Sequence, residues 1–277
     1  MVDDGSVPPV EHAVFQDAPT ELKTLLVRNE ASVGAPAARN IGVKHADSEW
    51  IAFLDDDDRF FPGKIEAVGQ LIQQYPDTDL VYHPALIRMV REKVEYVSGA
   101  EDLAASAEPD QELLVRNLVG GTSMVVVRKS CFLKVGGFDD SMAPIEDWEL
   151  YIRFAAEKAR FRFIPEPLCL YFHDSQISSL TKDLKKQEGA ILRLKEKHAR
   201  AYGLLGRSQV KAFDANVLRS VAFKALLNRQ PWPAFKGQLK VFLFTMGMKD
   251  LLVLMLIPFG NKAVFFVRSL ARRYLHG

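Results

Sequence analysis

The sequence predicts an α/β fold, with a mixed, mainly parallel sheet flanked by helices and a helical C-terminal extension. Short apolar strands alternate with helical patterns across residues 1–85, and this alternation is typical of a largely parallel sheet. From about residue 181, long helical patterns rich in Lys and Arg replace the strands. We therefore expect a first domain over residues 1–182 and a helical region over residues 183–277.

The alternation is built from short segments. Each predicted strand is a brief apolar run, and the clearest helix carries Ile65, Val68 and Leu71 at helical spacing. Strands are expected at 1–4, 25–28, 50–54 and 80–83, and helical segments at 34–43, which begins as a loop, and at 62–74.

The next hundred residues continue the pattern less regularly. Residues 92–117 are polar, and we interpret them as an irregular excursion over the active face. Beyond them we expect strands at 122–127 and 161–164, a short helix at 130–135, a turn at 136–139 and a helix at 147–156.

Composition excludes several classes of protein. The net charge of +1 makes a general polyanion binder, and hence a nucleic-acid partner, unexpected. Cys131 and Cys169 form neither a disulfide framework nor a metal-ligand cluster, which favours a reduced, cytoplasmic setting. The acidic N-terminus does not resemble a signal peptide, and the apolar run 251–260 is too short to span a membrane.

Four consecutive aspartates, Asp55 to Asp58, directly follow the apolar strand at 50–54. A solvated loop or a helix start would explain one or two of them, but not four beside a buried strand. Carboxylates are hard oxygen ligands that suit Mg²⁺ or Mn²⁺, and ligands bind open α/β sheets at the carboxyl ends of strands. The sequence therefore predicts a metal site here.

Two further motifs are ambiguous when each is taken alone. Asp147, in Glu146-Asp147-Trp148 at a helix start, is by itself better explained as an N-cap. Arg39, in Ala37-Ala38-Arg39-Asn40 at a loop–helix junction, could bind a diphosphate, but by itself it is better explained as a surface arginine.

Taken together, the motifs form a series of short segments along the chain: Asp3-Asp4-Gly5-Ser6, Gly34 with Ala38-Arg39-Asn40-Ile41-Gly42, Ile51-Ala52-Phe53-Leu54 with the four aspartates, Gly136-Gly137-Phe138-Asp139, and Glu146-Asp147-Trp148-Glu149-Leu150. Their order and spacing resemble family 2 glycosyltransferases of the GT-A type, in particular bacterial cell-surface polysaccharide glycosyltransferases. The resemblance covers residues 1 to about 180.

The resemblance implies a role for each matching residue. Asp147 resembles the general base, and Asp55 and Asp57 resemble the metal-binding D-x-D pair. The nucleotide contacts implied are Asp4, Arg39, Asn40 and Asp56, and the acceptor or phosphate contacts are Glu146, Trp148 and His173, with Gly121-Thr122-Ser123 shaping the acceptor or sugar pocket.

The implied reaction is a single displacement that inverts the anomeric carbon of a nucleotide-sugar donor, with uridine the family's commonest base. The acceptor would be a saccharide or a lipid-linked molecule of the cell envelope. A nucleotidyltransferase also uses strand-end aspartates with a metal, but the Gly-rich basic loop expected near its start is not seen in this sequence.

The start of the chain departs from the family pattern. Relatives carry a strand and a helix before the Asp-Asp-Gly-Ser turn, whereas only Met1 and Val2 precede it in this sequence. The alternative function is therefore an inactive nucleotide-binding or scaffolding relative.

Two interpretations of the C-terminal region stay open. Residues 241–248 and 251–259 are strongly apolar, and Arg268, Arg272 and Arg273 follow them. These helices could rest on an anionic membrane, which would place the protein at the inner face of the plasma membrane. They could equally pack on the catalytic domain or on a second subunit, as in a homodimer.

Overall fold

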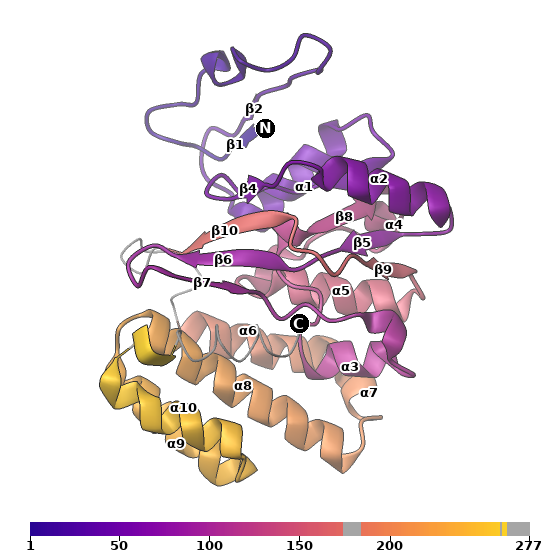
Figure 1. Ribbon diagram of the computed structural model, residues 1–277. Helices are drawn as coiled ribbons and strands as arrows, with labels where there is room; N and C mark the ends of the chain where they lie inside the picture. The colour runs from indigo at the N-terminus through magenta and orange to yellow at the C-terminus, as the bar shows by residue number, and fades with distance from the viewer. Residues whose placement is uncertain (174–183, 261, 265–277) are drawn as a thin grey trace.

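A computed structural model describes residues 1–173, 184–260 and 262–264 of the chain (Figure 1). The predicted domain boundary near residues 180–185 falls largely outside the described residues. Helix α6 (Leu184–Lys197) is the first element after the gap.

The central sheet has the order β3 (Trp50–Ala52), β8 (Val125–Arg128), β5 (Leu80–Tyr82), β9 (Phe161–Phe163). Strand β8 runs antiparallel to both of its neighbours, whereas β5 and β9 are parallel. Strands β3, β5 and β9 therefore share one direction, and β8 opposes it.

Both faces of the central sheet are buried, because successive side chains of a strand point to opposite faces. Val81 and Val126 pack with Val68 of helix α2 (Lys64–Gln74) on one face. The other face carries Leu80 and Val127, which join α3 (Pro109–Val115) and α5 (Glu146–Ala156) in the largest apolar cluster. The packing of helices on both faces of the sheet fixes the carboxyl end of β3, where the aspartates lie.

A second sheet continues from the first through His83 and Pro84. Its order is β4 (Arg59–Phe60), β10 (Cys169–His173), β6 (Ala85–Met89), β7 (Val94–Val97). Only β10 and β6 are parallel in this sheet. The sheets are thus mixed as expected, but parallel pairs are not the majority among the described strands, because β8 sits between parallel strands and β7 returns beside β6 as a hairpin.

The N-terminal strand β1 (Val2–Asp3) pairs in parallel with β2 (Val27–Arg28) in a separate two-stranded sheet. Residues between these strands, including the short helix η1 (His12–Phe15), extend away from the body of the molecule (Figure 1). Helix α1 (Ala35–His45) lies against β1.

The interpretation of residues 92–117 as an irregular excursion was wrong. They contain β7, the short helix η2 (Leu103–Ala105) and α3. Leu113, Leu114 and Val115 are buried in the main cluster, so the segment contributes to the core. The predicted strand at 122–127 begins instead as a 3-10 turn, η3 (Thr122–Met124), before β8.

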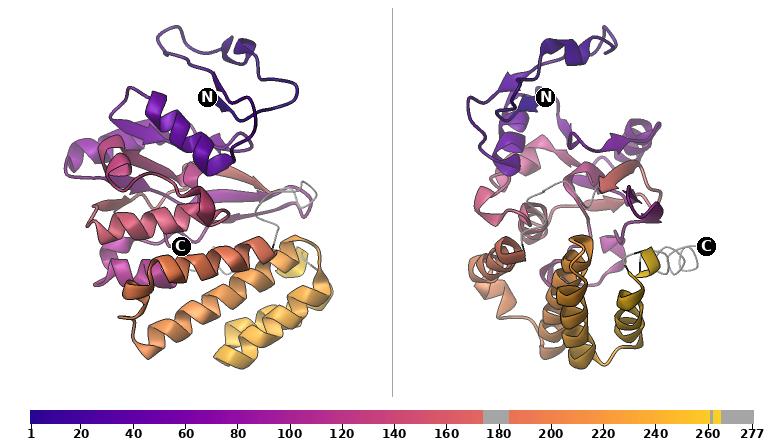
Figure 2. Two further views of the ribbon diagram at one scale, coloured as in Figure 1. Left: turned by 180° about the vertical axis from the view of Figure 1, so that it is seen from behind. Right: turned by 90° about the vertical axis from the view of Figure 1, so that its left-hand side faces the viewer.

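The short helices α4 (Lys129–Lys134) and η4 (Asp140–Met142) complete the first part of the chain. The C-terminal region is helical, as predicted: α6 is followed by α7 (Ala199–Tyr202), α8 (Arg207–Leu227), α9 (Pro231–Thr245), α10 (Met248–Leu256) and η6 (Ile257–Phe259). Figures 1 and 2 show these helices on the side of the sheets away from α1 and α2. None of the helices in the described ranges is long and apolar enough to cross a membrane.

Candidate active site

The four aspartates lie in the turn that leaves β3, beside the start of β8. Continuing the β3–β8 register places Asp55 opposite Ser123, and the Asp55 amide donates to the Ser123 hydroxyl at 3.1 Å. The Thr122 hydroxyl lies 3.4 Å from the Asp55 carboxylate. The antiparallel pairing thus brings the predicted Gly121-Thr122-Ser123 segment to the acidic turn.

The aspartates differ in exposure and in charge. Asp56 and Asp57 are exposed, and burial together with the charges of Asp55 and Asp56 raises the pKa of Asp57. Asp58 is buried, and burial raises its pKa to about 7. The charges of neighbouring carboxylates contribute to the raised pKa values of Asp57 and Asp58, and a cation bound here would relieve that repulsion.

A buried cation lies under this turn. Lys64, at the start of α2, is almost fully buried and donates to the Ser123 carbonyl at 2.8 Å, with its ammonium 3.6 Å from the centre of the Phe60 ring. Burial lowers the pKa of Lys64 to about 8, and Asp58 opposes that change. No motif pointed to Lys64, because its neighbours in space come from other segments.

Arg39 of α1 joins the acidic turn to the start of α5. Its guanidinium donates to Asp55 at 2.6 Å and to Glu146 at 3.1 Å. Burial opposes the charge of Arg39, but Asp55 and Glu146 outweigh it and raise the arginine pKa. Three residues that the sequence singled out separately therefore meet in one ionic cluster.

Asp147 lies next to this cluster in the first turn of α5. Its carboxylate accepts a hydrogen bond from the Trp148 amide at 2.6 Å. Burial and the charge of Glu146 raise the pKa of Asp147 to about 7, although Arg39 and Lys224 act in the opposite direction. A carboxylate with a pKa near neutrality is suited to accept a proton.

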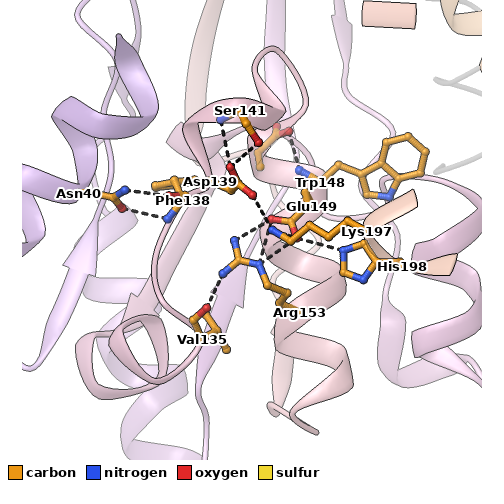
Figure 3. A network of polar contacts seen from close by, with 11 residues as sticks. Asn40, Val135, Phe138, Asp139, Ser141, Trp148, Glu149, Arg153, Lys197 and His198 are labelled. Atoms are coloured by element: carbon orange, nitrogen blue, oxygen red, sulfur yellow. Dashed lines mark hydrogen bonds and ion pairs between the residues drawn. The ribbon is translucent and has the colours of Figure 1, made fainter. Parts of the chain in front are cut away.

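Glu149, two residues further along α5, has a lowered pKa where that of Asp147 is raised. It is fully buried and paired with Arg153 at 2.7 Å, with Lys197 at 2.9 Å and with His198 at 3.0 Å (Figure 3). Burial raises its pKa, but these partners outweigh burial and lower the pKa of Glu149 to about 2. Lys197 also contacts Asp139 at 2.6 Å, so α6 is tied to α5 and to the preceding turn.

The predicted nucleotide residues Asp4 and Asn40 are occupied by contacts within the chain. The Asp4 carboxylate accepts from Asn29, Ser32, and the amides of Val33 and Gly34, at 2.7 to 2.9 Å. Despite burial, these bonds lower the pKa of Asp4 to about 2.

Asn40 fastens α1 to the Gly-Gly-Phe-Asp turn. Its amide donates to the Phe138 carbonyl at 2.8 Å and accepts from the Phe138 amide at 2.9 Å (Figure 3). Gly137 has a φ of +72°, and a Cβ there would approach the Asn40 side-chain oxygen to 2.6 Å, so this turn requires glycine.

Trp148 and His173 were predicted as acceptor or phosphate contacts, and both roles stay predictions. Trp148 is buried, donates to the Leu113 carbonyl at 2.6 Å and packs near Phe213, so its indole is part of the core. His173 ends β10 opposite Met89.

Two residues near the carboxylates had no sequence motif. Tyr171 lies in β10, which pairs with β4 directly after the acidic turn, and burial together with the charges of Asp58, Asp57 and Asp55 raises its pKa. Burial lowers the pKa of Lys224 on α8 to about 8, against the pull of Asp147 and Glu146. Tyr171 could have been found by its period-2 spacing from His173, whereas Lys224 required the tertiary fold.

The acidic turn suits a divalent cation held jointly with a ligand. No group of three His, Cys, Asp or Glu residues within the described ranges could hold a metal ion by itself. Mg²⁺, however, is commonly bound through one or two carboxylates plus substrate phosphates. The exposed Asp57 and the Asp55 carboxylate provide that number of ligands.

Comparison with known proteins supports the family that the motifs suggested. The family model described as "Glycosyltransferase like family 2" matches residues 1–199. The match therefore includes the acidic turn, α5, helix α6 with Lys197, and His198 directly after it.

Similar curated proteins carry the same family name. An uncharacterized glycosyltransferase of Haemophilus influenzae is 29% identical over 248 residues, covering 89% of this chain and 82% of the relative. The uncharacterized glycosyltransferase YwdF of Bacillus subtilis is 31% identical, over 64% of this chain and 65% of the relative. The pre-mycofactocin glycosyltransferase of Mycobacterium tuberculosis is 33% identical, over 63% of this chain but 37% of the relative.

Among solved structures, S. aureus TarS aligns with a TM-score of 0.52 at 14% identity, covering 90% of this chain and 43% of that protein. At this identity the likeness concerns the fold, and it agrees with the α/β arrangement of the GT-A type expected from the sequence.

Proposed function

The chain belongs to glycosyltransferase like family 2 and is a glycosyltransferase, and from its site we propose an inverting transfer of a sugar. The donor is a nucleotide-sugar, with a uridine diphosphate sugar the first choice. The acceptor is a hydroxyl of a saccharide or lipid-linked molecule used in cell-envelope polysaccharide synthesis.

The observation that carries this proposal is the position of Asp147 in the first turn of α5, next to Glu146, which Arg39 links to Asp55 of the acidic turn. The raised pKa of Asp147 lets its ionised carboxylate take the proton of an acceptor hydroxyl near neutral pH. The hydroxyl oxygen then forms a bond to the anomeric carbon as the bond to the diphosphate oxygen breaks, and the leaving diphosphate takes the electron pair. One such displacement inverts the anomeric carbon, and it needs no covalent nucleophile.

The donor side of the proposed site is formed by Arg39 and the acidic turn. Arg39 holds Asp55 and Glu146 in the structure, and its planar guanidinium also suits a diphosphate. Asp56 is exposed where a ribose could reach it. Asp55 and Asp57 are the residues that would hold Mn²⁺ or Mg²⁺, which supplies positive charge opposite the leaving diphosphate.

The cellular setting that we propose is the cytoplasmic face of the plasma membrane. A lipid-linked acceptor would be presented there, and the C-terminal helices expose apolar and basic side chains. A homodimer is the competing use of the same helices.

The test is turnover of nucleotide-sugars with Mn²⁺ present, measured as nucleoside diphosphate release. Donors are first ranked by the rise in Tm that they cause, because a ligand that binds the folded state stabilises it. Asp147→Asn should lower kcat by about 10²- to 10⁴-fold while leaving the donor-induced rise in Tm unchanged. Asp140→Asn, at an exposed aspartate of the same segment, is the matched control.

The outcomes separate the competing functions. Donor-induced stabilisation without turnover in the wild type would favour a nucleotide-binding or scaffolding protein. Equal turnover in Asp147→Asn and Asp140→Asn would remove Asp147 from the role of base.

A further inference from the structure

Helices α9 and α10 expose an unusual number of large apolar side chains to solvent. Met248 is 76% exposed and Phe259 is 78% exposed. We call the set the α9–α10 apolar surface; it consists of Trp232, Leu243, Phe244, Met246, Met248, Leu252, Met255 and Phe259.

The exposed residues of α10 follow a helical stripe rather than a random scatter. Met248, Leu252 and Met255 recur at intervals of three and four residues, and Phe259 continues the stripe into η6. Other apolar side chains of the same segment pack into the protein, because Leu254 and Ile257 are buried. Helix α10 is therefore apolar on both faces.

One face of the helix pair is already covered by the protein. Helix α9 packs against α8 and α10, and Ala234 and Ile257 lie in the apolar cluster under β6 and β10. The residues of the α9–α10 apolar surface stay exposed beside this packing. Isolated exposed apolar residues are normal on proteins, but many of them on two packed helices, with a stripe along one of them, indicate an interaction site.

The charges around this surface identify its partner. Lys236, Lys240 and Lys249 are exposed on the same two helices. Asp250 is the acidic residue of the segment 229–277, and Arg219 of α8 neutralises it with contacts of 2.7 and 2.9 Å. Exposed lysines on the same helices as exposed apolar side chains complement the anionic headgroups and acyl chains of a bilayer.

We propose that the α9–α10 apolar surface docks the protein onto an anionic lipid bilayer, lying in the interface without crossing it. The apolar side chains enter the boundary between headgroups and acyl chains, while the lysine ammonium groups stay at the level of the lipid phosphates. This mode agrees with the absence of a spanning helix in the described ranges. The proposal concerns binding alone and stands or falls independently of sugar transfer.

The test is co-sedimentation of the full chain with vesicles of POPC, with or without about a third of POPG. One variant replaces Met248, Leu252, Met255 and Phe259 by Ser, and a second replaces Lys236, Lys240 and Lys249 by Gln. The control replaces Leu192 and Leu204, two exposed leucines outside the surface, by Ser. Each variant is accepted for comparison when its Tm matches that of the control.

The wild type and the control should pellet with POPG vesicles much more than with POPC. The partition coefficient of the serine variant should fall at least about tenfold, because each large apolar side chain that leaves water contributes to the free energy of binding. The glutamine variant should lose the preference for POPG. Equal pelleting of the serine variant and the wild type would overturn the proposal.

A second measurement needs no surface variant that could fail to fold. Trp232 is 63% exposed, so brominated lipids in POPG vesicles should quench part of the wild-type tryptophan emission, and this part should vanish in Trp232→Phe. Absence of quenching would contradict insertion. A wild-type dimer by light scattering that the serine variant converts to a monomer would assign the surface to a second copy instead.

Discussion

Asp147 and Glu149 lie two positions apart in helix α5, yet they occupy opposite electrostatic states. Glu149 is surrounded by three cationic or protonatable partners, which hold its pKa at about 2. Asp147 receives one backbone hydrogen bond, and burial beside Glu146 raises its pKa to about 7. The difference shows that the partners supplied by the tertiary fold, and not the position in the helix, decide whether a buried carboxylate has a lowered or a raised pKa.

The largest effect is expected from Glu149→Gln. Removing one member of a buried ionic network leaves the others uncompensated, so we expect a loss of about 3–5 kcal/mol in the free energy of unfolding. Urea denaturation near pH 7 measures it. Glu157→Gln, which loses an exposed pair with Lys134, is the control and should cost under about 1 kcal/mol.

The Glu149 contribution should also depend on pH with a definite sign. Because its pKa is lowered in the folded state, the stabilisation is present above the unfolded value of about 4.3 and is lost as pH falls toward 2. If the difference in the free energy of unfolding between the wild type and Glu149→Gln stayed constant from pH 7 to pH 3, the pKa of Glu149 would not be lowered by its ionic partners.

The second expected effect is on the pH profile of turnover. Asp147 acts as a base only when ionised, so kcat/KM for the donor should rise with pH and level off near the pKa of about 7. Between about pH 5 and pH 7 the rise should be about 50-fold, because the ionised fraction of Asp147 grows from about 0.01 to about one half. Initial rates across this range measure it, and a flat profile would mean that Asp147 is not the group whose ionisation limits the reaction.

The next expected effect is a loss of stability in Asn40→Ala, where a side-chain amide rather than a carboxylate is removed. Asn40 makes two hydrogen bonds to the Phe138 backbone, so its loss should cost about 1–3 kcal/mol of stability. The measurement is again urea denaturation, with donor affinity read separately by thermal shift. A variant with normal stability but weakened donor binding would place Asn40 at the nucleotide, as the family pattern implies.

The smallest effect is expected from Lys224→Met. Its charge favours the ionised form of Asp147, so removing it should move the pH profile to higher pH and lower turnover at pH 6.5 by roughly threefold. Lys224→Arg should restore the profile. Lys236→Met, an exposed lysine on α9, is the matched control, and an equal shift in both variants would exclude a local effect of Lys224.

The sequence was sufficient to predict the helices and strands whose residue pattern is local. The strand before Asp55, helix α2 with its 3.6-residue periodicity, and the start of α5 were predicted close to their observed bounds. The ordered motifs also predicted the family that the comparison with known proteins supports.

Sequence reasoning failed where the outcome depends on distant partners. Residues 94–97 form a strand because β6 is there to pair with them, and Trp148 is buried because α3 and α8 enclose it. Likewise, nothing in the local sequence distinguishes Glu149 from Asp147, since Lys197 ends α6 and His198 precedes α7. The state of a carboxylate is set by tertiary neighbours that periodicity does not reveal.

The antiparallel pairing of β3 with β8 has a consequence for how such proteins can diversify. Because the register alone brings Ser123 opposite Asp55, a single inserted or deleted residue between positions 52 and 55, or between 123 and 126, would misalign the two sides of the acidic turn. The segment between β1 and β2, residues 4–26, is not held in such a strand register. Length variation among relatives should therefore accumulate in that outlying segment, while the residue count across the turn stays fixed.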